Sequence, residues 1–198
     1  NALALEAYVY LLIQAYRQYG HLAAQTNPLA QGPTAAVELE LSRFGLDASH
    51  LQQKFQAGKH VGLGTTATLQ DILGLLKATY CGSIATELGV IQSLEQRQWL
   101  ETRLEKTRGR TAFAVDIKKR ILERLTRSEA LERFLHTRYV GQKRFSIEGA
   151  EALIPGIEHA IDKAAQSGAT EAVIGMAHRG RLNVLCNTLG KPVEDLFV

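Results

Sequence analysis

Apolar residues recur every three or four positions through most of the first two-thirds of the chain, which is the pattern of helices that bury one face. The predicted helices cover 3–19, 35–43, 69–80, 93–106, 113–125 and 128–136. Gly20 follows the first of these and marks its end. Thr68 precedes the third, and its hydroxyl can cap that helix together with Asp71, three residues further on.

The helix expected over 93–106 has few apolar positions. We expect Leu94, Trp99 and Leu104 to anchor it to the rest of the protein. Acidic and basic residues alternate along 101–110, and we interpret this stretch as a solvated helix face.

The pattern changes after residue 141. A helix is expected over 150–167, and the short apolar run 171–177, which contains β-branched residues, predicts a strand. A second helix should run from His178 to Leu189, with Gly190 as its stop. Helix, strand and helix in this order predict the beginning of a parallel sheet, so the fold class is α/β overall with a mostly helical N-terminal region.

The length and composition permit two small domains. The chain has 198 residues, 45% hydrophobic and 22% charged, which is a globular profile. We place a helical domain at 1–105 and the incomplete start of an α/β domain at 106–198. The net charge of +3 gives no case for nucleic-acid binding, and the apolar stretch 7–13 is too short to span a membrane.

Two cysteines, Cys81 and Cys186, lie far apart among apolar neighbours, without the spacing of a zinc site. They could form one disulfide or remain buried free thiols. Free thiols are the favoured interpretation, as is typical of a reducing cytoplasm.

Candidate chemistry lies where the predicted strand ends and the next helix begins. Ligands of parallel sheets gather at such junctions, and a helix N-terminus attracts anions. His178, Arg179 and Arg181 stand there, and Gly180 lets the backbone approach a ligand or another element closely. Arginine can bind a carboxylate or phosphate, and imidazole can donate a hydrogen bond to one. The alternative is that these side chains only cap the strand and pair with surface acids. The spacing does not choose between a cofactor phosphate and a substrate carboxylate.

Other polar residues have structural interpretations. Lys143 and Arg144 could approach a cofactor or a dimer interface, but a surface ion pair is favoured. Ser146 and Glu148 are interpreted as a turn and a helix start, and His21 as a cation at a helix end.

Several segments together resemble the decarboxylating component of 2-oxoglutarate dehydrogenase. They are 16–29, 79–84, 96–100, 143–149 (KRFSIEG), 152–155 (ALIP) and 175–185 (GMAHRGRLNVL). They span nearly the whole chain in the order of that family. The resemblance identifies the chain as an N-terminal fragment of a thiamine-diphosphate-dependent enzyme, with the cofactor-binding α/β domain beginning at 106.

The resemblance implies a function for the full-length enzyme. It would decarboxylate 2-oxoglutarate in the tricarboxylic acid cycle and transfer the succinyl group to a lipoyl domain of dihydrolipoyl succinyltransferase. It would be a homodimer that uses thiamine diphosphate and Mg²⁺, in the bacterial cytoplasm or in the mitochondrial matrix. By the same resemblance His178 is catalytic and lies in the substrate pocket, and Arg179 contacts the cofactor diphosphate and the substrate.

The sequence departs from the family in two respects. The run 87–91 (ELGVI) lacks the usual aromatic–methionine pair, and no Gly-Asp pair begins a magnesium-binding motif. We therefore expect no metal site, no bound cofactor and no activity in this fragment alone. Two alternatives remain open: a 2-oxoadipate-decarboxylating paralogue, and a helical module that docks the core of the complex.

Overall fold

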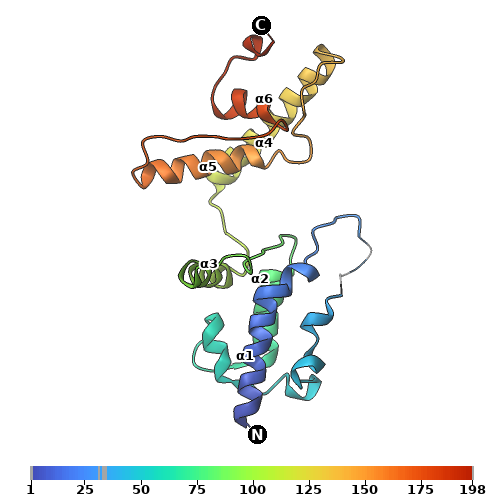
Figure 1. The fold of residues 1–198 in the computed structure, drawn as a ribbon, viewed down its shortest axis with the longest axis vertical. Helices are drawn as coiled ribbons and strands as arrows, with labels where there is room; N and C mark the ends of the chain where they lie inside the picture. Colours follow the sequence, from blue (N-terminus) through green and yellow to red (C-terminus); the bar gives the residue numbers. More distant parts are fainter. Residues whose placement is uncertain (1, 31, 33–34, 198) are drawn as a thin grey trace. The chain divides into compact units, whose positions relative to one another are not determined.

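The computed structural model describes residues 2–30, 32 and 35–197, and the chain forms two compact units (Figure 1). Unit 1 is Asn1–Ala112 and unit 2 is Phe113–Val198. The division falls seven residues beyond the domain boundary expected from the sequence, which was drawn after residue 105. The identity of the two domains remains a prediction.

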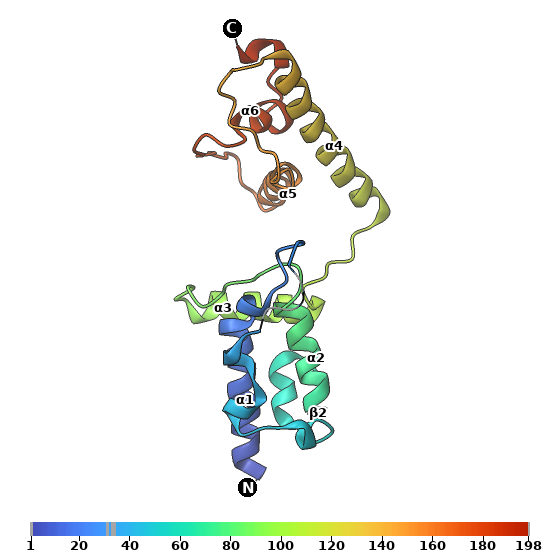
Figure 2. The ribbon, with the colours of Figure 1, turned by 90° about the vertical axis from the view of Figure 1, so that its right-hand side faces the viewer.

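Two helices, α1 (Ala2–Tyr19) and α2 (Leu69–Tyr80), lie side by side in unit 1 (Figure 2). Both were predicted, and their apolar faces form the core of the unit. The predicted cap of α2 is confirmed, since the Asp71 backbone N–H donates to the Thr68 hydroxyl at 3.1 Å. Gly20 permits the close approach of the end of α1 to the end of α2, because a Cβ there would lie 2.5 Å from the Cβ of Tyr80.

The connection between α1 and α2 consists of short elements. The helix predicted over 35–43 is wrong in kind: two 3₁₀ turns, Val37–Leu39 and Leu41–Phe44, flank an extended Glu40. A small antiparallel sheet follows, in which β1 (Lys54–Phe55) pairs with β2 (Ala67–Thr68). Strands of two residues are too short for alternation of apolar and polar positions to reveal them.

The third helix of unit 1, α3 (Leu94–Thr107), was predicted, but two of its three predicted anchors are wrong. Leu94 and Trp99 are each 57% exposed. The buried residues of α3 are Glu101 and Glu105, at 6% and 3% exposure. The interpretation of 101–110 as a solvated face is therefore wrong for its two acidic residues.

Burial of these glutamates is explained by Arg17, near the C-terminal end of α1. The Arg17 guanidinium donates to both Glu105 carboxylate oxygens, at 2.8 and 2.9 Å, and lies 3.3 Å from a Glu101 oxygen. The Tyr80 hydroxyl donates to the same Glu105 carboxylate at 2.8 Å. A buried carboxylate is tolerated where a cation and further donors satisfy it. This charge cluster joins α1, α2 and α3, which crosses the ends of the other two helices (Figure 2).

Unit 2 contains α4 (Val115–Arg138) and α5 (Leu153–Gln166), which pack together, and a short α6 (Arg181–Asn183) that continues into the π-helical turn Val184–Thr188. Two helices were predicted over 113–125 and 128–136, whereas the structure has one. No glycine or proline interrupts this stretch, so the helix continues.

The strand predicted over 171–177 is wrong. The segment has no regular secondary structure, and Val173 is 97% exposed. A strand needs a neighbour for its backbone hydrogen bonds, and the described residues of unit 2 contain no other strand. The parallel α/β layer is accordingly not seen in the described residues, which are mostly helical.

Cys81 and Cys186 are free thiols, as favoured from the sequence. Each is partly rather than fully buried, and this burial raises the pKa of both thiols. Within the described ranges, no helix has the length and apolar character needed to cross a membrane.

The Arg17 cluster predicts a large effect on stability. Arg17→Ala should lower the free energy of unfolding of unit 1 by about 3 kcal/mol, because it leaves the buried Glu105 without its cation and Glu101 with only Arg97, at 3.8 Å. Chemical denaturation measures this change. Arg43→Ala, at an exposed position, is the control, and equal effects of the two substitutions would contradict the interpretation.

Tyr16 predicts a dependence of stability on alkaline pH. Burial raises the pKa of its hydroxyl to about 12, so the folded state holds the proton more tightly than the unfolded state. The stability from this difference is complete below pH 10 and is lost as the pH rises through 12, by about 3 kcal/mol in all. Tyr16→Phe should reduce this loss in denaturation experiments. The exposed control Tyr8→Phe should not, and a loss unchanged by Tyr16→Phe would exclude Tyr16 as its source.

Candidate functional site

Two motif segments of unit 2, 143–149 and 175–185, lie directly against each other. The Gly180 backbone N–H donates to the carbonyl oxygen of Phe145 at 2.7 Å. Gly180 also packs on the buried side chain of Ile147: its φ is +78°, and a Cβ at this position would lie 2.9 Å from that side chain. Glycine is required here by both its backbone angle and the space available. The segments that carry the resemblance therefore form one structural feature.

The buried carboxylate of Glu132 accepts hydrogen bonds from both motif segments. Glu132 of α4 is 2% exposed and accepts hydrogen bonds from the Asn183 amide at 3.1 Å and from the Ile147 backbone N–H at 3.4 Å. Its cation is Arg144, at 3.3 Å. The Asn183 amide also donates to the Ser128 carbonyl at 3.0 Å. Arg144 thus forms an ion pair, as favoured from the sequence, but with a buried partner.

Phe145 has an unusual backbone conformation, with φ at +49°, a region that non-glycine residues rarely adopt. Its ring stacks on the imidazole of His178, with centroids 4.8 Å apart and planes inclined by 27°. The Arg181 guanidinium lies 5.9 Å from the centre of the same ring. Strained backbones of this kind concentrate at functional sites, where the surrounding structure holds them.

The two predicted site residues are neighbours on the surface of unit 2. His178 and Arg179 are both exposed. Arg179 donates from one guanidinium nitrogen to the Ser146 carbonyl at 2.8 Å, so each residue contacts the 143–149 segment. Both precede α6, which begins at Arg181 with Gly180 as its N-cap. Unit 2 has a hollow of about 480 Å³ between α4 and α5. Neither His178 nor Arg179 lines this hollow.

The remaining candidates have structural contacts. The Ser146 hydroxyl accepts from the Glu148 backbone N–H at 3.1 Å, which is the turn that the sequence predicts. Glu151 accepts from the Gly149 backbone N–H at 2.9 Å and closes the next turn. Lys143 is exposed.

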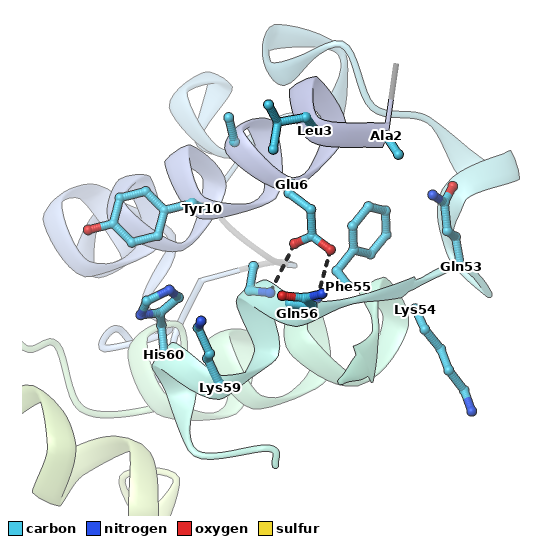
Figure 3. Close-up of a pocket in the computed structure, with 12 residues that line it drawn as sticks. Ala2, Leu3, Glu6, Tyr10, Gln53, Lys54, Phe55, Gln56, Lys59 and His60 are labelled. Atoms are coloured by element: carbon cyan, nitrogen blue, oxygen red, sulfur yellow. Dashed lines mark hydrogen bonds between the residues drawn. The ribbon is translucent and has the colours of Figure 1, made fainter. Parts of the chain in front are cut away.

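Unit 1 has a hollow of about 620 Å³ between the start of α1 and the 3₁₀ helix Gln56–Val61 (Figure 3). Glu6 projects into it, but its carboxylate accepts backbone N–H groups of Gln56 and Ala57, at 2.7 and 3.0 Å. On the other side, the rings of Tyr10 and His60 make an edge-to-face contact with centroids 5.1 Å apart. Glu6 therefore stabilises the start of a helix, and its contacts give it no catalytic role.

The described residues do not provide a complete site for thiamine diphosphate and Mg²⁺. No group of three or more acidic, histidine or cysteine side chains within 2–30, 32 and 35–197 is arranged to hold a metal ion. The sequence also contains no Gly-Asp pair, with which a diphosphate–magnesium motif would begin. Arg179 remains a candidate for contact with an anion.

The sequence did not reveal the buried polar residues that hold the site, Glu132 and Asn183. Glu132 lies in a stretch of α4 rich in charged residues, where it resembles a surface residue. Asn183 lies within the 175–185 motif, and an amide directly between Leu182 and Val184 is the one local signal of a buried polar role.

Gly180 provides a test of the contact between the motif segments. Gly180→Ala should lower the free energy of unfolding of unit 2 by about 2 kcal/mol, since the new methyl group meets Ile147 and the backbone is strained. Gly175→Ala is the matched control, because its φ is not positive and no atom lies within 4 Å of the added carbon. Thermal or urea denaturation compares the two, and a neutral Gly180→Ala would mean that the segments do not pack this way.

Comparison with known proteins finds relatives named for 2-oxoglutarate metabolism. The chain is 45% identical to the 2-oxoglutarate dehydrogenase E1 component of Azotobacter vinelandii over 187 residues, and 44% identical to that of Cupriavidus necator. It is 46% identical over 189 residues to the multifunctional 2-oxoglutarate metabolism enzyme of Mycolicibacterium vanbaalenii. Each alignment covers 94% of this chain, but only 20%, 20% and 15% of the three relatives.

No family model matches the chain. The relatives nevertheless confirm the resemblance seen in the motifs, and the chain spans about a fifth or less of their length. The chain is therefore homologous, over nearly all of its residues, to part of the 2-oxoglutarate dehydrogenase E1 component.

Proposed function

We propose that this chain is an N-terminal part of an enzyme that oxidatively decarboxylates 2-oxoglutarate and passes the succinyl group to the lipoyl domain of dihydrolipoyl succinyltransferase. The observation that carries the proposal is the 44–46% identity across 94% of the chain to proteins named for 2-oxoglutarate metabolism. The full-length protein would be a homodimer that acts in the tricarboxylic acid cycle. The bacterial relatives favour a cytoplasmic location.

The arrangement in unit 2 supports a substrate-binding role for His178 and Arg179. A dicarboxylate such as 2-oxoglutarate is an anion, and an arginine beside an imidazole offers it charge-assisted hydrogen bonds. The stack on Phe145 limits the orientations open to the His178 ring, so its nitrogens can be presented in a fixed direction. Arg179 is anchored through one nitrogen on Ser146, which positions the guanidinium beside the imidazole.

The full-length enzyme would use thiamine diphosphate and Mg²⁺, which supply the decarboxylation chemistry when bound. Arg179 would contact the cofactor diphosphate, and the metal ligands would come from residues outside this chain. The α/β domain belongs to the same proposal, and strands from the rest of the protein would build its parallel sheet. By itself the 198-residue chain should be inactive.

Steady-state kinetics of the full-length protein test the proposed role of His178. His178→Ala should lower kcat/KM for 2-oxoglutarate by about 10- to 100-fold, the value of a lost hydrogen bond to a charged group. His159→Ala, at another exposed histidine of unit 2, should leave the kinetics unchanged. Unchanged kinetics in His178→Ala would remove this residue from the site.

The same assays decide the substrate. Higher kcat/KM with 2-oxoadipate than with 2-oxoglutarate would identify the paralogous activity instead. Absence of turnover with both oxo acids, in the presence of thiamine diphosphate, Mg²⁺ and an electron or lipoyl acceptor, would overturn the proposed function.

A further inference from the structure

The fold separates charges of α3 that alternate in the sequence. Glu101 and Glu105 face inward to Arg17, and they are the only acidic residues between positions 96 and 115. The basic residues of the same stretch do not share this burial: Arg103 and Lys106 are exposed. Because the carboxylates are taken into the core, the outer side of this part of α3 carries positive charge alone.

An exposed tryptophan lies on that outer side. Trp99, Arg103 and Lys106 are spaced four and then three residues apart, which places them on one face of the helix. The Arg103 guanidinium lies 4.3 Å from the centre of the Trp99 ring, in a cation–π contact. We call these three residues the α3 face.

A hollow adjoins the α3 face on the side of the N-terminal half of the helix. It measures about 540 Å³, and Ile91, Trp99 and Leu100 supply its apolar lining. Glu95 also lines it, from the first turn of α3, where the helix dipole favours an acidic residue. An apolar hollow is thus bounded by a tryptophan and followed by two cations.

We propose that the α3 face and this hollow bind an acidic polypeptide segment of a partner protein. An apolar side chain of the partner would fill the hollow beside Trp99, and its carboxylates would pair with Arg103 and Lys106. Charge complementarity argues for this occupant, since the face carries cations that no neighbouring carboxylate of α3 neutralises. Tryptophan and arginine are also the residues most enriched where protein interfaces gain their affinity.

A nucleic acid fits this surface less well. The chain has a net charge of only +3, whereas nucleic-acid binding depends on many cations that neutralise phosphates along the strand. The inference concerns unit 1 alone and does not depend on the proposed enzymatic function.

Trp99 is the single tryptophan of the chain, so its fluorescence reports on the hollow directly. The probe is a short peptide with leucines among glutamates. Added to the 198-residue protein, it should shift the Trp99 emission to the blue, saturably, and protect it from acrylamide quenching. Arg103→Glu combined with Lys106→Glu should weaken binding at least about tenfold. Lys118→Glu combined with Lys119→Glu, on exposed residues of unit 2, changes the net charge equally and should leave binding unchanged.

Three results would overturn the proposal. The first is a failure of acrylamide to quench Trp99 in the free protein, which would show that the face is already covered. The second is an α3 double variant that keeps its circular dichroism spectrum and binds the peptide as the parent does. The third is a lysine–leucine peptide or a single-stranded oligonucleotide that binds as tightly as the acidic peptide.

Discussion

The guanidinium of Arg17 holds unit 1 together at the point where three helices meet. It lies near the end of α1 and forms ion pairs with Glu105 and Glu101 of α3. The hydroxyl of Tyr80, from α2, donates a hydrogen bond to the same Glu105 carboxylate. Apolar packing joins α1 to α2, but α3 presents two buried carboxylates to them. Without this cation a buried carboxylate would be strongly destabilising. The position of α3, and the charge left on its outer face, follow from this ion pair.

Unit 2 also contains a buried carboxylate that pairs with an arginine. Glu132 is buried, pairs with Arg144, and binds the backbone and side-chain donors of both motif segments. The close packing of Gly180 on Ile147 completes the contact. The strained Phe145 and its stack on His178 therefore lie on segments that a buried ion pair and its hydrogen bonds hold together.

The contacts within unit 2 give a physical reason for the motifs that carry the family resemblance. The motifs 143–149 and 175–185 are far apart in the sequence, yet they meet through a glycine N–H, a carboxylate and an aromatic ring. The relatives named for 2-oxoglutarate metabolism share nearly the whole of this chain. The proposed substrate, a dicarboxylate, suits the pair formed by His178 and Arg179. The docking surface proposed on α3 arises from a different cause, the inward turn of its acidic residues.

The sequence alone determined the long helices, the Thr68 cap and the likeness to a known enzyme component, because helical periodicity, capping chemistry and motif order are local. It predicted a strand over 171–177 that these residues do not form, since a strand depends on a partner that the periodicity of one segment does not reveal. It also placed Trp99 inside and Glu101 outside. Only the tertiary structure decided those positions, because the cation that makes burial of Glu101 and Glu105 possible lies more than eighty residues away, on α1.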